Sequence, residues 1–234
     1  MINVVCDLDL DEWMYKVPND VRSLLCDKFP NVKFTYDKDP GVEKILNSDI
    51  YWGNRLKKLA SERLKSHRLS WIHFGSVGYE RIFKSNLNLK KILVSNSFNT
   101  MDTGIVNHGL YLIFSLLRSG YGIDKIRKIK SLNRENFEKF SHNIKNIEDL
   151  KILILGLGRI GKKLATKLNK LGAKVDGVKK NTPIKKLSFV ENIYKFEDIY
   201  NFIHNYDLVI SLLPYDENLN EIYDKKFFDS MQKN

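Results

Sequence analysis

Short apolar runs alternate with amphipathic segments along most of the chain. Apolar runs bounded by turn residues are typical of strands buried in a parallel sheet, and apolar residues three or four apart are typical of the helices that cover it. The pattern predicts an α/β protein with two parallel-sheet units. In the first unit the expected strands are 2–8, 32–36, 50–52, 70–74 and 92–94. One helix is expected to start with Asp20 as its N-cap, and two more are expected over 42–46 and 56–64.

The second unit repeats this alternation. Its expected strands are 152–155, 174–178, 192–196 and 207–213, and its expected helices are 160–171, 197–204 and one that starts at 225. Between the units, residues 104–117 predict a strongly apolar helix buried between two domains, and residues 121–148 predict a polar, basic surface segment. We therefore expect one α/β domain over 1–97 and a second over 98–234.

Three glycines join the first strand and the first helix of the second unit with the spacing G-x-G-x-x-G. Gly156 would permit the tight turn, Gly158 would let the backbone approach a pyrophosphate, and Gly161 would let the helix pack closely on the strand. The amides of the first helical turn, at Arg159 and Ile160, would then hold the phosphate charge. The alternative is an ordinary structural glycine turn.

Composition narrows the function classes. The chain has 234 residues, 39 Lys and Arg against 28 Asp and Glu, and a net charge of +11. Because the lysines are scattered and no zinc-finger or RNA motif is present, nucleic-acid binding is the least favoured alternative, and the cluster 125–130 is interpreted as solvated surface. No apolar run is long enough to span a bilayer, so we expect no membrane partner. Cys6 and Cys26 form neither a metal-ligand spacing nor a disulfide framework, so we expect no metal and a reducing, cytoplasmic setting.

Four segments, taken in order, resemble the D-isomer-specific 2-hydroxyacid dehydrogenases. Residues 69–78, Leu-Ser-Trp-Ile-His-Phe-Gly-Ser-Val-Gly, are similar to the family's L-x-W-I-x-x-x-S-A-G segment. Loop amides of that segment hold the substrate carboxylate in the family. The resemblance therefore implies substrate-binding positions at Ser76, Val77 and Gly78.

The next two segments extend the resemblance. Residues 94–96 and 105–118 are similar to the family's "V-T-N … V-A-E … L-L-L-A-x-x-R" helix, with Asn107 where the family usually has glutamate. Residues 150–161 match the second half of its "L-x-G-K-x-x-G-I-x-G-L-G-R-I-G" block closely. The implied fold is a flavodoxin-like substrate domain followed by a Rossmann dinucleotide-binding domain.

The fourth segment, residues 207–214, corresponds to the family's D-x-V-x-x-x-L-P, where the chain passes the nicotinamide side of the cofactor. The family commonly continues with x-T-x-x-T, and here Asp216 and Leu219 take the threonine positions, which leaves the local contacts open. The cofactor contacts implied by this segment are Leu212, Leu213 and Pro214.

The chemistry implied by the resemblance is hydride exchange between a nicotinamide and C2 of a small 2-hydroxy or 2-keto acid. In the family an arginine binds the substrate, and a histidine paired with a carboxylate moves the hydroxyl proton. These groups lie beyond the L-P segment, so no catalytic residue is assigned here. His67 is interpreted as solvated, and the remaining histidines as structural: His73, His108, His142 and His204.

The chain ends at Asn234 within the helix expected from 225, with the strand 207–213 as an open sheet edge. We therefore expect an N-terminal fragment with an incomplete dinucleotide-binding domain, inactive alone. The alternative is a non-catalytic dinucleotide-binding protein, such as a sensor. Family members are usually homodimers, and the resemblance implies that residues 104–117 help to form the contact.

Cofactor preference depends on the end of the second strand of the second unit. NAD-selective Rossmann domains place an acidic residue there, which accepts from the ribose hydroxyls. Here Lys179 and Lys180 follow the strand, and Asp176 lies inside it. Two lysines suit the 2′-phosphate of NADP, so NADP is favoured over NAD. The alternative is that both lysines reflect the general lysine excess of the chain.

Overall fold

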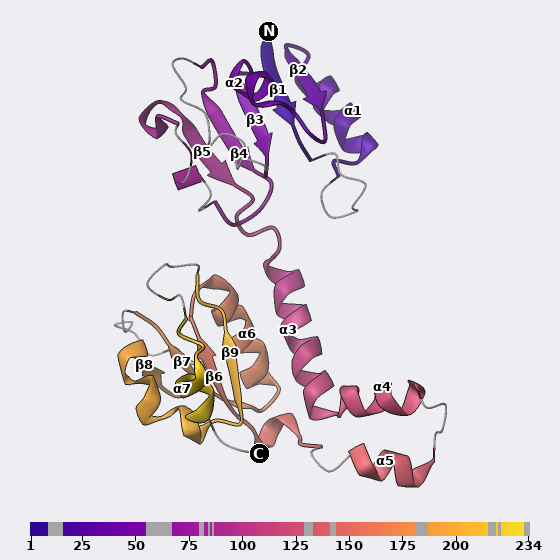
Figure 1. Ribbon diagram of the computed structural model, residues 1–234, viewed down its shortest axis with the longest axis vertical. Helices are drawn as coiled ribbons and strands as arrows, with labels where there is room; N and C mark the ends of the chain where they lie inside the picture. The colour runs from indigo at the N-terminus through magenta and orange to yellow at the C-terminus, as the bar shows by residue number, and fades with distance from the viewer. Residues whose placement is uncertain are drawn as a thin grey trace. The chain divides into compact units, whose positions relative to one another are not determined.

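The computed structural model describes residues 1–8, 16–54, 67–79, 82–83, 85, 87–128, 133–140, 144–180, 187–214, 219 and 221–231, side chains 121, 137 and 140 excepted. The chain divides into two compact units, Met1–Met101 and Asp102–Asn234 (Figure 1). The helix predicted at 56–64, His142 and Asp216 lie outside the described residues.

The first unit contains a five-stranded parallel sheet with the order β2-β1-β3-β4-β5. This is the flavodoxin-like order, which confirms the predicted fold class. Each predicted strand is present: β2 has its predicted bounds, and the others differ from theirs by one or two residues at an end. The strands are β1 Ile2–Cys6, β2 Val32–Tyr36, β3 Ile50–Gly53, β4 Trp71–Phe74 and β5 Leu93–Asn96.

The described helices of the first unit are α1 Asn19–Lys28, α2 Val42–Leu46 and the 3-10 segment η4 Leu89–Lys91. The predicted N-cap Asp20 was wrong, because Pro18 holds the cap position without a side-chain cap and Asp20 lies in the first turn. Its carboxylate there still complements the helix dipole. The buried core of this unit includes Ile45, Tyr51 and Ile72.

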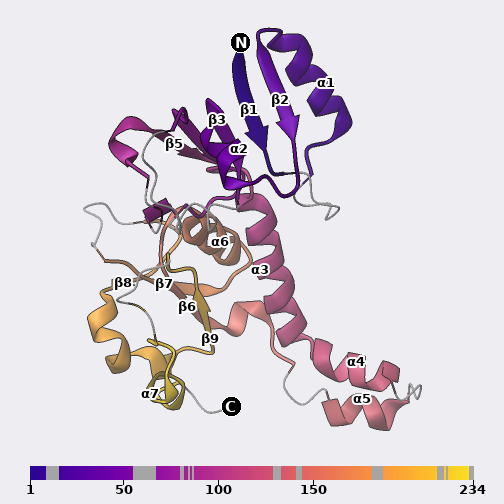
Figure 2. The ribbon, with the colours of Figure 1, turned by 45° about the horizontal axis from the view of Figure 1, so that its top comes forward.

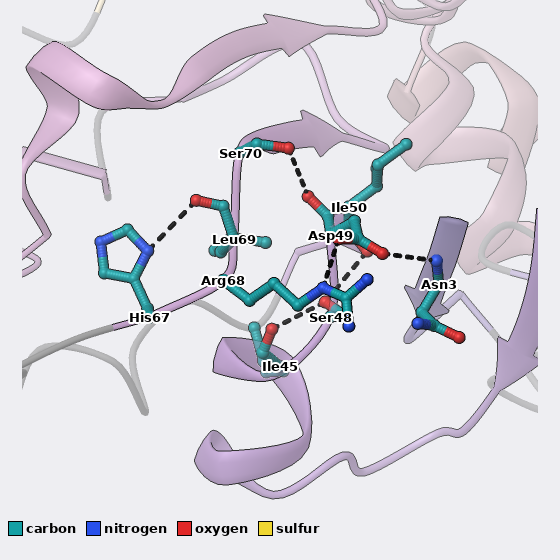
Figure 3. Close-up of polar contacts among 9 residues, drawn as sticks. All are labelled: Asn3, Ile45, Ser48, Asp49, Ile50, His67, Arg68, Leu69 and Ser70. Carbon is teal, nitrogen blue, oxygen red and sulfur yellow. Dashed lines mark hydrogen bonds and ion pairs between the residues drawn. The ribbon is translucent and has the colours of Figure 1, made fainter. Parts of the chain in front are cut away.

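A carboxylate joins three segments at the amino edge of this sheet (Figure 3). Asp49 Oδ2 accepts from the Asn3 amide at 2.8 Å, Oδ1 accepts from Arg68 Nε at 2.6 Å, and the Asp49 carbonyl accepts from Ser70 Oγ at 2.9 Å. The Asn3 amide, and then Arg68, lower the pKa of the Asp49 carboxyl. Asp49 therefore ties β1 to the starts of β3 and β4.

The second unit contains a four-stranded parallel sheet with the order β8-β7-β6-β9. This is a Rossmann-type arrangement, and β9 pairs with β6 as expected. The apolar strand β6 lies in the middle of the ladder, where its residues from Ile152 to Leu155 are fully buried. The strands are β6 Lys151–Leu155, β7 Lys174–Val178, β8 Ile193–Tyr194 and β9 Leu208–Ser211.

The helices of this unit are α3 Asp102–Leu117, α4 Gly120–Lys128, α5 Arg134–Phe140, α6 Arg159–Lys170 and α7 Lys225–Asp229, with 3-10 segments η5 Ile147–Asp149, η6 Phe196–Asn201 and η7 Ile203–Asn205. The α-helix predicted at 197–204 was wrong, because Phe202 leaves helical geometry at φ −137° and stacks on Tyr194 with centroids 4.2 Å apart. The helix that begins at 225 ends at Asp229 with Ser230 as its C-cap, and does not run on as expected.

The apolar helix α3 is buried on one face only. Val106 and Ile113 lie in the core of the second unit, with Leu164 of α6 in the same cluster. Tyr111 and Leu116 are 66% and 67% exposed. The described part of its own unit leaves the side chains of this second face uncovered, and burial of the helix between two domains stays a prediction.

Candidate functional site

The glycine turn between β6 and α6 gives each of its three glycines a distinct environment. Gly156 has φ +100°, and a Cβ there would lie 2.7 Å from the Leu212 carbonyl oxygen. A Cβ on Gly161 would lie 2.1 Å from the Gly156 oxygen. Around Gly158 no atom of the described part of the chain lies within 4 Å of a built Cβ. Two positions thus require glycine for the fold, and the third borders open space.

The first turn of α6 presents backbone donors beside that open space. Gly158 is the N-cap, and no side chain caps the helix. Amides of a first helical turn have no intrahelical acceptor, so those at Arg159 and Ile160 point out of the helix start. The turn itself is anchored elsewhere, because the amides of Gly156 and Leu157 donate to the Val178 carbonyl at 3.0 and 3.2 Å.

A fourth glycine, not identified from the sequence, supports the turn from the next strand. A Cβ on Gly177 of β7 would lie 2.2 Å from Leu157 Cδ1. The Leu157 side chain is buried and packs over this position. A glycine inside a strand marks a close approach of this kind, which is the signal that could have identified it.

The end of β7 has its acidic and basic residues in different roles. Asp176 Oδ2 accepts from Tyr206 Oη at 2.6 Å, and Oδ1 accepts from the Asn192 amide at 2.7 Å. Burial, and then the bond to Asp176, raise the pKa of Tyr206. Lys179 follows the strand half-buried, and Lys180 is exposed. The Asp176 carboxylate is thus engaged in hydrogen bonds within the unit, whereas the two lysines lie just after the end of the strand.

The end of β9 contacts the glycine turn directly. The Leu212 amide donates to the Leu155 carbonyl at 2.8 Å, and the Leu212 carbonyl borders Gly156. Leu213 is half-buried and Pro214 is exposed. The structure thus brings the predicted segment Leu212–Pro214 to the turn.

A buried carboxylate from α3 pairs with two cations of α6. Asp102 is 1% exposed, and its Oδ2 accepts from Arg159 Nε at 2.5 Å and from Lys163 Nζ at 3.0 Å. The hydrogen bond from Arg159, and then that from Lys163, lower the pKa of Asp102. Sequence reasoning missed this trio, because no local pattern relates Asp102 to residues in another helix.

In the first unit, the loop that is predicted to bind the substrate carboxylate follows β4, and hydrogen bonds hold it on both sides. The Ser76 amide donates to Asn54 Oδ1 at 3.1 Å, and Asn96 Nδ2 donates to the Val77 carbonyl at 2.6 Å. Ser76 Oγ donates to the Gly78 carbonyl at 2.9 Å. Within the described residues the amides of Val77 and Gly78 have no hydrogen-bond acceptor, whereas the Ser76 amide already donates to Asn54.

A second buried carboxylate lies at the switch point of this sheet, between β1 and β3. Asp7 is 1% exposed, accepts a short hydrogen bond from Tyr51 Oη, and accepts from the Asn54 amide at 3.0 Å. A Cβ on Gly53 would lie 2.2 Å from Asp7 Oδ1. Asn54 thus links Asp7 to Ser76. An aspartate directly after a buried strand was the available signal, and sequence reasoning missed it.

Three of the four described histidines contact neighbouring residues through their rings. His73 Nδ1 lies within hydrogen-bond distance of Ser95 Oγ, at 2.8 Å, and the same hydroxyl accepts from Trp71 Nε1 at 2.8 Å. Burial lowers the pKa of His73. His67 is half-buried with Nδ1 3.1 Å from the Leu69 carbonyl, so the expectation of a solvated ring was wrong.

His108 stacks on Tyr111, and His204 is exposed. Across the described ranges, no histidine forms an ion pair with a carboxylate, and no three metal-ligating side chains form a group. Of the helices that the structure describes, none combines the length and the apolar character needed to cross a membrane.

Two parallel α/β units and a glycine turn at the head of the second define a dinucleotide-binding α/β protein. A family model described as the NAD binding domain of D-isomer specific 2-hydroxyacid dehydrogenases matches residues 110–234. This is more than half of the chain, and the chain therefore belongs to that family. A search of curated protein sequences found no match.

Solved structures share the fold across nearly the whole chain. A D-isomer specific 2-hydroxyacid dehydrogenase family protein from Aeromonas salmonicida is 18% identical with a TM-score of 0.73, over 97% of this chain and 68% of that one. D-lactate dehydrogenase from Aquifex aeolicus, complexed with NAD and lactic acid, is 16% identical with a TM-score of 0.70, over 98% and 66%.

An NADPH-dependent glyoxylate/hydroxypyruvate reductase from Sinorhizobium meliloti, in complex with NADP and sulfate, is 19% identical with a TM-score of 0.71, over 99% and 68%. The chain thus spans about two thirds of the length of these three proteins. At such identities the likeness establishes the fold, and the two complexes contain different nicotinamide dinucleotides.

Proposed function

We propose that this chain is the dinucleotide- and carboxylate-binding part of an NAD(P)-dependent oxidoreductase acting on a small 2-hydroxy or 2-keto acid. Residues 1–97 would form the substrate domain and residues 98–234 the dinucleotide-binding domain. The observation that carries the proposal is the glycine turn, in which Gly158 borders open space while Gly156 and Gly161 are closed by backbone atoms.

The turn fits a dinucleotide for steric and electrostatic reasons. A backbone with no Cβ at Gly158 lets a pyrophosphate approach, and the amides of Arg159 and Ile160 lie at the positive end of the α6 dipole. Gly161 keeps the helix start close to Gly156. The chemistry that a bound nicotinamide supplies is hydride exchange with C2 of the substrate, and Leu212, Leu213 and Pro214 would line that side.

Carboxylate binding is assigned to the loop after β4. The Val77 and Gly78 amides would donate to the substrate carboxylate, as backbone N–H groups do in other anion-binding turns. Ser76 would shape the loop through its bonds to Asn54 and Gly78. Because these donors are backbone groups, they select a carboxylate and leave the rest of the substrate unspecified.

For the cofactor we favour NADP over NAD. Lys179 and Lys180 follow β7, where a 2′-phosphate needs cationic partners. Asp176, the acid nearest to this point in the strand, has both oxygens engaged by Tyr206 and Asn192. It therefore offers little to ribose hydroxyls.

A second candidate is a dinucleotide-binding protein without catalysis, such as a sensor. A protein of this kind would bind the dinucleotide through the same glycine turn. Because the first candidate is also expected to be inactive as a fragment, cofactor binding without turnover of glyoxylate, hydroxypyruvate or pyruvate would fit both candidates. Turnover of any of them with NADPH or NADH would exclude it.

Titration calorimetry of the chain with NADPH and NADH tests the proposal, using Gly158→Ala as the discriminating variant. Among the described residues no atom lies within 4 Å of the added Cβ, so the variant should fold as stably as wild type. The methyl would meet the pyrophosphate, so both affinities should fall by about tenfold or more, the equivalent of about 1.4 kcal/mol. Equal nucleotide affinity in the variant, or no binding by wild type, would refute the proposed site.

A further inference from the structure

The first turn of α6 carries positive charge without an acid of its own. Arg159 is the first residue of the helix, Lys163 lies one turn later, and the first turn contains no acidic residue. Cations at a helix amino end oppose the helix dipole. The compensating carboxylate comes from another helix, because Asp102 of α3 accepts from both side chains through one oxygen.

The two helices lie side by side with their amino ends at the same end of the unit (Figure 2). A further contact joins them, in which Lys167 Nζ donates to Asn107 Oδ1 at 2.9 Å. The α6 side chains that face α3 therefore recur every four residues, at Arg159, Lys163 and Lys167. Only the pair next to the glycine turn meets a carboxylate.

The carboxylate holds together two charges that would otherwise separate. Arg159 Nε and Lys163 Nζ contact the same oxygen, so two like charges lie within a few ångströms of one another. Without Asp102 they would repel and extend into water. With it, the three groups sum to one positive charge at a fixed place. A bond at Nε also fixes the plane in which the other guanidinium donors lie.

We propose that Asp102 is a positioning residue for the cofactor pyrophosphate, which it serves by holding Arg159 and Lys163 at the start of α6. This inference rests on the proposed dinucleotide function of the turn. Asp102 itself would not touch the cofactor. Its lowered pKa keeps the carboxylate ionised at neutral pH, so the arrangement is present under ordinary conditions.

The test is NADPH affinity of the full chain, measured for Asp102→Ala, Asp102→Asn, Arg159→Gln and the double variant Asp102→Ala/Arg159→Gln. Asp102→Ala should weaken binding about tenfold, the value of one charge-assisted hydrogen bond. Asp102→Asn should weaken it about threefold, because its amide oxygen still accepts from Arg159. In the Arg159→Gln background, Asp102→Ala should add less than about a twofold change.

Two matched controls separate this role from charge and from packing. Asp124 also pairs with an arginine and a lysine, Arg127 and Lys128, but on the exposed helix α4. Asp124→Ala therefore makes the same charge change away from the turn. Asn107→Ala removes the other α3–α6 polar contact. Both should keep wild-type affinity, and circular dichroism melts verify the fold of each variant.

The salt dependence of NADPH affinity also distinguishes the proposed role from a purely structural one, which would leave that dependence unchanged. Wild-type affinity should fall more steeply with salt than that of Asp102→Ala, because the ordered cations contribute less in the variant. Equal or tighter NADPH binding by a folded Asp102→Ala would overturn the inference and leave the proposed function standing. If Asp102→Ala does not fold, wild-type affinity in Asp102→Asn would overturn it equally. Failure of wild type to bind any dinucleotide would instead refute the function, and this inference with it.

Discussion

The Leu157 side chain occupies the space that a Cβ on Gly177 would need, with Cδ1 only 2.2 Å from the built position. Leu157 is the residue between the first two glycines of the turn, and Gly177 lies in the neighbouring strand β7. The turn is thus locked to the sheet by a side chain as well as by its two bonds to the Val178 carbonyl.

Gly177→Ala should therefore destabilise the protein. An added methyl in this packed position forces Leu157 to move, at a cost of about 1–3 kcal/mol in the free energy of unfolding. Urea unfolding measures the change, and NADPH affinity should fall with it because the turn shifts. Gly104→Ala is the matched control, since its Cβ has open space and the residue lies in a helix, where alanine is favoured. A Gly177→Ala midpoint equal to that of wild type would contradict the packing.

Removing the two lysines after β7 should change cofactor selectivity. Lys179→Gln/Lys180→Gln should weaken NADPH binding about tenfold and leave NADH binding within about twofold, because only NADP carries the 2′-phosphate. Fluorescence titration with both reduced cofactors provides the ratio. Lys174→Gln/Lys170→Gln serves as the charge-matched control at exposed positions of the same unit. Parallel losses for both cofactors would show that the lysines act by general charge.

The loss of folding stability at acidic pH, here called the acid limb, should depend on Asp49. Its folded-state pKa lies below its ordinary value, so its contribution is present above the unfolded-state pKa, about 3.9, and is lost as the pH falls through the folded value. Asp49→Asn should therefore reduce stability at pH 7 and flatten the loss of stability below about pH 4. Thermal melts between pH 3 and 7 measure both effects, with Asp20→Asn as a control at an exposed position. An acid limb of unchanged slope in Asp49→Asn would contradict the Figure 3 contacts.

The exposed face of α3 should mediate self-association as a homodimer, which is the state expected of the family. The face presents Tyr111, Leu112 and Leu116, and apolar side chains grouped on a surface commonly mark an interface. Leu116→Lys should shift the sedimentation of a dimer to that of a monomer. Leu24→Lys alters a similarly exposed leucine in the first unit and should have no effect. A wild-type chain that sediments as a monomer at every concentration would refute the dimer.

The parts of the fold that depend on local sequence could be predicted. The spacing of the three glycines in the turn was enough to predict the steric role of each. The bounds of β7 and α2 were also predicted as observed. The α-helix wrongly predicted at 197–204 shows the limit. There Phe202 gains more by stacking on Tyr194 than by continuing a helix, and such a gain is tertiary.

The parts of the candidate site that depend on distant pairs could not be predicted. Asp102 and Arg159 are 57 residues apart, and Asp7 and Asn54 are 47 apart, so no periodicity relates them. The resemblance supplied Ser76 as a carboxylate contact, but only the structure shows its amide donating to Asn54. Backbone donors can be assigned from sequence by motif, whereas their availability depends on neighbours that only the fold brings close.

The bond between Asp176 and Tyr206 has a consequence for redesign of coenzyme preference. An engineer who wished to create an NAD-selective variant would look for an acidic side chain near the end of β7, and would find one already there. Its oxygens accept hydrogen bonds from Tyr206 and Asn192. Breaking these bonds would remove contacts between β7 and the segments that precede β8 and β9. The productive substitution is Lys179→Asp, one position beyond the strand, where a new carboxylate would replace a cation without breaking an internal bond.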